Sequence, residues 1–170
     1  MKGIFKVIAL CASVLLIVIV IRAVLHTPKI TDQVERIDYA LDEGLMLAHL
    51  SESIRFETIS HQNSENLNVS AFDGFQKWVR HTYSQLDNSL ELTTFNGTML
   101  YKWVGTDPVL KPILVTGHYD VVPVIPGTED LWQQPPFSGK IYDGYVWGRG
   151  ALDDKSGVIG ILEAVSYLMA

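Results

Sequence analysis

The sequence predicts an α/β domain, a mixed sheet flanked by helices, that follows one separate apolar helix at the amino terminus. The strongest strand signal is the run rich in β-branched residues at 113–116, and the strongest helix signal is the periodic apolar run at 158–169. Asn-Gly at 96–97 and Asp-Gly at 143–144 are typical of two hairpin turns. Helices that alternate with the strands of a mixed sheet indicate a layered α/β fold rather than a sandwich or a helical bundle.

The first 25 residues predict a membrane-spanning signal anchor. Lys2 and Lys6 precede an uncharged run at 7–21, and a helix from Ile4 to Leu25 would be about 33 Å long, enough to cross a hydrocarbon core of about 30 Å. No small-residue cleavage site follows the run, so an uncleaved anchor is favoured over a removed signal peptide. Positive charge before the span predicts a single-pass protein whose remainder lies outside the cytoplasm, in a periplasmic, extracellular or lumenal space. Cleavage of the segment would instead give a secreted protein.

Residues 26–40, which include Pro28, predict a short tether into a second domain at 41–170. This domain is expected to begin with a helix, because apolar residues recur there at helical spacing. The residues of this predicted face are Leu41, Leu45, Ala48 and, near the helix end, Ile54.

A second helix is predicted to start at Ser70, which forms a capping-box pattern with Asp73. Its expected core stripe comprises Phe72, Phe75, Val79 and Leu86. The two hairpins are expected to pair residues 90–95 with 99–104 and residues 140–142 with 145–147. The last helix would bury a face made of Val158, Ile161, Leu162, Val165, Leu168 and Met169.

A polar group follows the predicted strand directly. Side chains alternate between faces in extended backbone, so His118 and Asp120 should point to one face and Tyr119 to the other. The carboxyl end of a strand is where open α/β sheets bind ligands, so we predict a polar site there. The alternative is that His118 is a hydrogen-bonded structural residue.

A second polar cluster, W-G-R-G-A-L-D-D-K-S-G at 147–157, precedes the last helix. Carboxylate oxygen and imidazole nitrogen both bind divalent metals, so Asp153 and His118 together would make half of a metal site. Capping of the following helix is the alternative role for Asp153 and Asp154. The glycine spacing matches neither a dinucleotide fingerprint nor a phosphate loop, which disfavours nucleotide binding.

Three passages carry a family resemblance: I-R-F-E-T-I-S at 54–60, G-H-Y-D-V-V-P at 117–123, and 132–157 with its P-P-F-S-G and G-R-G landmarks. In this order they resemble the M20 metallopeptidases, and especially the carboxypeptidase S-like branch that includes N-acyl-amino-acid hydrolases. The resemblance runs from about residue 40 to the end and covers only the amino-terminal portion of the family's catalytic domain.

The resemblance implies specific roles for three residues. His118 would be a ligand to one of two zinc ions, and Asp153 would bridge both; cobalt or manganese are the alternative metals. Asp120, which we assign to the catalytic machinery, would orient the His118 ring through its other nitrogen. The Asp153–Asp154 peptide bond is expected to be cis, as in the family.

The implied activity is metal-dependent hydrolysis of amide bonds in peptides or N-acyl amino acids. The family's general-base Glu and its remaining ligands are missing, since Glu163 is the one acid after Lys155 and no His follows. We therefore expect an incomplete zinc-peptidase domain that is inactive alone, as a fragment, a truncation or a degraded gene. The alternative is a membrane-anchored, non-catalytic remnant that keeps part of the fold. A homodimer is expected only with the family's missing second domain.

Composition limits the other partners. The formal net charge of −6 disfavours nucleic acid, whose binding needs clustered Lys and Arg. Cys11 is the only cysteine, which excludes an internal disulfide. Asn68 and Asn96 lie in glycosylation triplets, which we interpret as unmodified loop sequence.

Overall fold

The computed structural model describes residues 2–26, 39–63 and 66–170, and divides the chain into two units, Met1–Tyr39 and Ala40–Ala170. Most of the predicted tether, residues 27–38, lies outside the described residues. The first unit contains helix α1 (Lys2–Leu25), so the predicted amino-terminal helix is confirmed. It buries none of its residues and is long and apolar enough to cross a membrane, a test that a signal sequence near the amino terminus also passes. A membrane span therefore stays a prediction.

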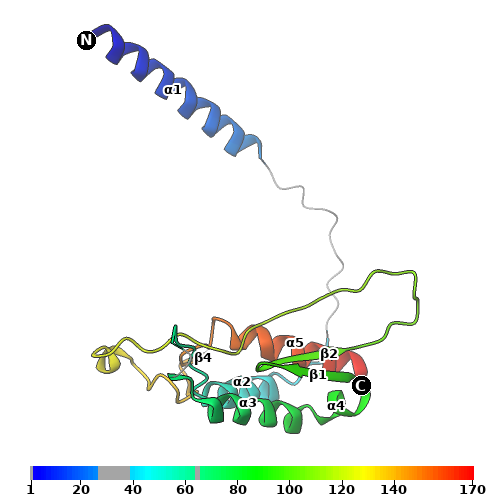
Figure 1. Cartoon of the computed structure of the whole chain (residues 1–170). Coiled ribbons are helices and arrows are strands. Elements are labelled where there is room, and N and C mark those ends of the chain that lie inside the picture. The colour runs from blue at the N-terminus through cyan, green and yellow to red at the C-terminus, as the bar shows by residue number, and fades with distance from the viewer. Residues whose placement is uncertain (1, 27–38, 64–65) are drawn as a thin grey trace. The chain divides into compact units, whose positions relative to one another are not determined.

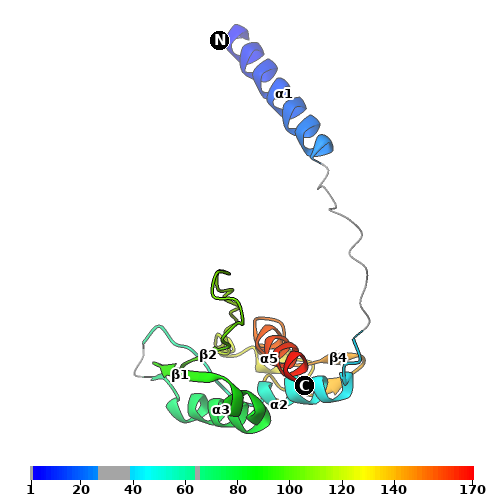
Figure 2. The ribbon, with the colours of Figure 1, turned by 90° about the vertical axis from the view of Figure 1, so that its right-hand side faces the viewer.

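The second unit combines helices with short hairpins (Figures 1 and 2). Its helices are α2 (Glu43–Ile54), α3 (Val69–Thr82), α4 (Ser84–Ser89), the short 3-10 helix η2 (Glu129–Leu131) and α5 (Lys155–Met169). Its strands are β1 (Glu91–Phe95), β2 (Thr98–Lys102), β3 (Ile141–Tyr142) and β4 (Tyr145–Val146). Helices α2 and α5 pack side by side.

Both predicted hairpins are confirmed. β1 pairs with β2 and β3 with β4, each pair antiparallel. Asn96 and Gly97 have φ angles of 46° and 83°, and Asp143 and Gly144 have 50° and 77°. Two successive positive φ values are the geometry of a type I′ turn, which Asn-Gly and Asp-Gly adopt readily because glycine has no Cβ and Asn and Asp tolerate this region.

The α/β class is confirmed, but the described strands form two separate two-stranded sheets rather than one mixed sheet. The predicted buried strand at 113–116 is wrong: Ile113 is 90% exposed and Leu114 75% exposed, and no described strand lies beside them. A strand is buried only when neighbours pair with its edges and cover its faces. The extended chain meets a neighbour further on, where Val121 forms a parallel bridge with Ile59.

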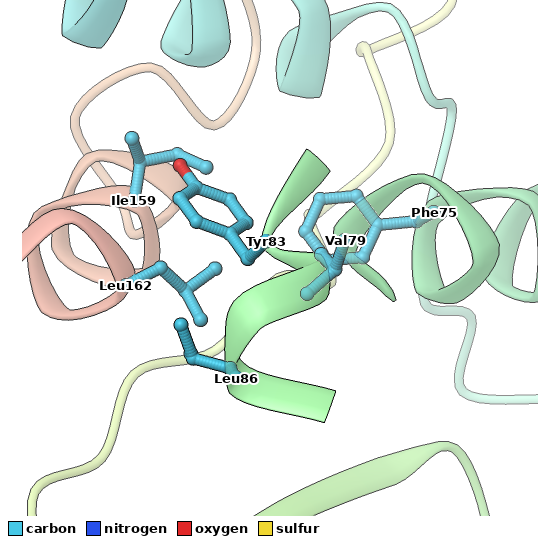
Figure 3. Close-up of a cluster of buried hydrophobic side chains, with 6 residues drawn as sticks. All are labelled: Phe75, Val79, Tyr83, Leu86, Ile159 and Leu162. Atoms are coloured by element: carbon cyan, nitrogen blue, oxygen red, sulfur yellow. The ribbon is translucent and has the colours of Figure 1, made fainter. Parts of the chain in front are cut away.

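A small apolar core holds the second unit together (Figure 3). Its buried members come from α3, the turn after it, α4 and α5, and are Phe75, Val79, Tyr83, Leu86, Ile159 and Leu162. The hairpin β1–β2 closes one side, since Met99 and Tyr101 pack against this cluster. Figure 3 shows Tyr83 between the α5 side chains and Val79, so this tyrosine links the two helical segments.

The helix boundaries correct the predicted caps. Asn68, not Ser70, is the N-cap of α3, and its side chain accepts a hydrogen bond from the Ala71 N–H. The Ser70 hydroxyl donates to the Asn68 side chain instead, so it reinforces the cap from the helix's second position. The predicted stripe also crosses a break, because α3 ends at Thr82 and Leu86 belongs to α4.

The structure confirms the two predicted helix faces in part. In α2, Leu45 is 49% exposed, whereas Ile54 is fully buried. In α5, the predicted Leu162 is buried, and Val158, Val165 and Met169 pack against the core. Leu168 is 66% exposed, and Ile159 is a buried residue that the prediction omitted. Apolar periodicity gives the width of a face, but the neighbouring helix decides which part of that face is covered.

Candidate metal centre

Two side chains from distant segments meet at the surface of the second unit. His118 Nε2 lies 3.0 Å from Asp153 Oδ1, although 35 positions separate the residues. The side chains are 51% and 88% exposed, so solvent reaches both. The structure therefore brings together the two residues that the sequence predicted to converge, and their role as metal ligands stays a prediction.

The backbone around His118 is fixed from the opposite face, as the predicted alternation requires. The Tyr119 ring stacks on Phe75, with 4.4 Å between centroids and 8° between planes. Its carbonyl accepts a hydrogen bond from Thr58 Oγ1 at 2.5 Å. Because Tyr119 is anchored in the core, its two neighbours are turned outward.

Asp120 contacts the second nitrogen of the imidazole. Its Oδ1 lies 3.2 Å from His118 Nδ1, and its backbone carbonyl lies 3.0 Å from the same nitrogen. Ser60 Oγ donates to Asp120 Oδ2 at 2.5 Å and holds the carboxylate in place. When a carboxylate accepts a hydrogen bond from one ring nitrogen, the lone pair of the other nitrogen can bind a metal.

Sequence reasoning missed Ser60. Ser60 lies in the stretch that forms the parallel bridge with Val121. The Ser60 N–H donates to the Val121 carbonyl, and the Val121 N–H donates to the Thr58 carbonyl, both at 2.9 Å. The passage 54–60 was recognised as a family landmark, but nothing local in it indicates a partner 60 positions away.

The Asp153–Asp154 peptide bond is cis, as the resemblance implied. Asp154 occupies the N-cap position of α5, yet its side chain makes no capping hydrogen bond. Its Oδ2 instead accepts from the His118 backbone N–H, at 3.4 Å. The predicted side-chain cap is therefore wrong for Asp154, because its carboxylate bonds the opposing segment rather than its own helix.

Lys155 fixes the first turn of α5 to the end of α2. Its side chain is fully buried, and Nζ donates to the carbonyls of Ser53 and Phe56 at 2.8 and 2.7 Å. A cation suits this place, because the last carbonyls of a helix carry partial negative charge. Burial lowers the pKa of Lys155 to about 7. The lysine thus places the preceding aspartates beside the extended segment that carries His118.

The electrostatics at His118 are set by its two acidic neighbours. Desolvation lowers the pKa of His118, but hydrogen bonds to the Asp120 carbonyl and to Asp153, together with the charges of both acids, outweigh it and raise the pKa above its ordinary value. A cation would replace the proton between the same groups. The adjoining cavity of about 300 Å³ is lined by His118, Asp120, Val121, Val122, Gly148, Arg149, Gly150, Leu152 and Asp153.

The donor set is incomplete for a closed metal site. In the described part of the chain, no group of three or more His, Cys, Asp or Glu side chains is arranged to hold a metal. Protein zinc sites use three or four protein ligands, so His118 and Asp153 fit a metal by chemistry but supply only part of its shell. Glu163 does not contribute, because it pairs with His49 at 2.5 Å and accepts from the Tyr83 hydroxyl at 2.7 Å.

Residues 114–170 match the model of peptidase family M20/M25/M40. Over 98% of its length the chain is 34% identical to probable carboxypeptidase S-like 2 of Dictyostelium discoideum, and it covers 34% of that protein. Over 71% of its length it is 37% identical to the N-fatty-acyl-amino acid synthase/hydrolase PM20D1 of Xenopus tropicalis, and it covers 24% of that protein. The chain therefore spans about a third or less of these relatives.

A solved structure supports the same relationship. The crystal structure of a M20 family metallo-carboxypeptidase, Sso-CP2, from Sulfolobus solfataricus matches with a TM-score of 0.56 and 26% sequence identity. The match covers 76% of this chain and 28% of that one. The similarity thus extends from sequence to the arrangement of the elements.

Proposed function

From the premise that this chain belongs to peptidase family M20/M25/M40 and matches its amino-terminal part, we propose that it contributes one half of the active site of a metal-dependent hydrolase. The observation that carries the proposal is the 3.0 Å approach of His118 Nε2 to Asp153 Oδ1. An exposed imidazole nitrogen and carboxylate oxygen at that separation are chemically suited to share one cation.

We assign His118 and Asp153 as ligands and Asp120 as the residue that orients the imidazole. Bound zinc would supply polarisation of the scissile carbonyl and a lowered pKa of a water molecule. Asp120 holds His118 Nδ1, so Nε2 is presented as the donor. Ser60 keeps the Asp120 carboxylate in the orientation that this requires. Two zinc ions bridged by Asp153 are the proposed complement, with cobalt or manganese as substitutes.

The proposed substrates are amides of amino acids, either peptides cleaved at the carboxyl terminus or N-acyl amino acids. Relatives named for each activity, carboxypeptidase S of Saccharomyces cerevisiae and PM20D1 of Xenopus tropicalis, match this chain at 36% and 37% identity. The general base and the remaining ligands are proposed to come from the part of the family's domain that this chain does not span. We therefore propose that these 170 residues alone do not hydrolyse substrate.

We also propose that α1 is an uncleaved signal anchor, which would hold the second unit outside the cytoplasm. Its support is the charge pattern, with Lys2 and Lys6 ahead of the apolar run. Extraction of membranes with alkaline carbonate tests the anchor: the full chain should stay in the pellet, and release into the supernatant at reduced mass would instead indicate a cleaved signal peptide.

Metal content tests the ligand assignment. The full chain in detergent should bind zinc or cobalt, and His118→Ala and Asp153→Ala should each abolish most of that binding. His81→Ala is the matched control, because His81 is an exposed histidine on α3, away from the candidate centre. Equal metal content in His118→Ala and His81→Ala would refute the assignment.

Metal binding without activity would be compatible with a second candidate function. The incomplete donor set of the described residues favours a non-catalytic, membrane-anchored protein for the chain as it stands. Hydrolysis of N-acetyl amino acids or of a carboxypeptidase substrate by the 170-residue chain would overturn that candidate.

A further inference from the structure

The Asp154 side chain connects the segment that carries Asp153 to the backbone of His118. Asp154 immediately follows Asp153, and its carboxylate reaches across to the His118 N–H, with 3.4 Å between Oδ2 and N. The side chain is half-buried and makes no cap to its own helix. The carboxylate instead bonds the opposing segment, 36 positions earlier in the chain.

Two glycines make room for this carboxylate. A Cβ on Gly157, in the first turn of α5, would lie 2.2 Å from Asp154 Oδ1. A Cβ on Gly117 would lie 3.2 Å from Asp154 Oδ2 and 3.0 Å from a methyl group of Val158. Atoms do not approach a real Cβ as closely as 2.2 Å, so the carboxylate occupies space that any other residue at 157 would fill. Gly117 likewise lets the extended segment approach the helix closely.

We propose that Asp154 is a positioning residue of the candidate metal centre: it holds the backbone of His118 against the first turn of α5, and so sets the separation between the His118 and Asp153 donors. The inference rests on the proposed function, because it concerns the assembly of the same site. It requires no direct contact between Asp154 and a metal.

The physical basis is that Asp154 lies close in the chain or in space to both proposed ligands. Asp154 is one residue from one donor and binds the main chain of the other, so a change of its side chain moves the two donors relative to each other. Loss of partners behind metal ligands typically lowers metal affinity about ten- to hundredfold. Asp154→Ala removes the acceptor, whereas Asp154→Asn keeps an oxygen that can accept from the His118 N–H.

The first measurement needs no metal. In the full chain in detergent, amide hydrogen exchange of His118 is compared with that of Val121, whose N–H donates to the Thr58 carbonyl and serves as the internal control. Asp154→Ala should accelerate exchange at His118 and leave Val121 unchanged, and Asp154→Asn should keep most of the protection. Unchanged exchange at His118 in Asp154→Ala would overturn the inference, whether or not the chain binds metal.

The second measurement uses cobalt as a spectroscopic probe of the same variants. Asp154→Ala should weaken cobalt binding about tenfold or more and shift the visible absorption bands, with Asp154→Asn close to wild type. Altered exchange together with an unchanged cobalt spectrum and affinity would overturn the positioning role and leave Asp154 merely structural. Failure of the wild-type chain to bind cobalt or zinc would overturn the proposed function, and the positioning role with it, although the exchange result would still establish the contact.

Discussion

The helical core and the extended segment that leads to His118 are built in opposite ways. The core buries Phe75, Tyr83 and Leu86 almost completely, and four segments of the chain contribute to it. In the extended segment, Ile113 and Leu114 are mostly exposed. The contacts described above gather near its end, where Thr58 and Ser60 bond to residues 119–121 and the Tyr119 ring packs on the core. The candidate centre lies where the two regions join: Asp153 shortly precedes α5 of the core, and His118 lies near the held end of the exposed segment.

The largest expected effect lies in the core. Phe75→Ala should lower the free energy of unfolding by about 3–5 kcal/mol, because it leaves a cavity under α3 and removes the ring on which Tyr119 stacks. Ile113→Ala should change it by less than about 0.5 kcal/mol, because that side chain already lies in water. Denaturant unfolding followed by tryptophan fluorescence measures both, and similar losses in the two variants would contradict the contrast.

The packing of the Asp154 carboxylate against the first turn of α5 can be tested with two glycines of that helix. Gly157→Ala should destabilise the protein by about 1–3 kcal/mol, because the new methyl group meets the Asp154 carboxylate. Gly160→Ala has nothing within 4 Å of the added Cβ and should stabilise it by about 0.5–1 kcal/mol through better helix propensity. Stabilisation by both substitutions would show that Asp154 does not occupy the space above Gly157.

The lowered pKa of Lys155 predicts how the free energy of unfolding depends on pH. Its pKa is about 7 in the folded protein and near 10.5 when unfolded, so between these values the unfolded chain binds more protons than the folded one. The free energy of unfolding contributed by this group should therefore rise as the pH increases from 7 to 10. Denaturation midpoints across this range measure the slope, and Lys155→Met should remove it; an equal slope in the variant would assign it to another group.

The smallest expected effect concerns the hydrogen bonds that hold the extended segment. Ser60→Ala should lower the free energy of unfolding by about 1 kcal/mol, since Asp120 loses its donor. Ser70→Ala is the control, because the Ser70 hydroxyl bonds an exposed side chain and should contribute less. Denaturation curves of the two variants give the comparison, which fails if Ser70→Ala proves the more costly change.

The sequence was most informative where structure depends on near neighbours. Asn-Gly and Asp-Gly specified both hairpins because the positive φ values of their turns are local properties of those residues. The alternation of His118, Tyr119 and Asp120 was equally readable, because extended backbone turns successive side chains to opposite faces. The family motifs placed the candidate ligands.

Prediction failed where a residue depends on a distant partner. The apolar run at 113–116 has the composition of a buried strand, but burial depends on neighbouring strands, which the described residues do not supply there. Ser60 and Asp154 gained their roles from partners 60 and 36 positions away.

The sequence by itself determined the hairpin turns, the approximate positions of most helices and the two side chains that face each other, since each follows from backbone preference or motif within a few residues. Only the tertiary structure decided that Lys155 ties α5 to the end of α2 and that Asp154 meets the His118 backbone. The physical reason is that a hydrogen bond depends on separation in space to within a fraction of an ångström. No local pattern fixes that separation between segments that fold together from far apart in the chain.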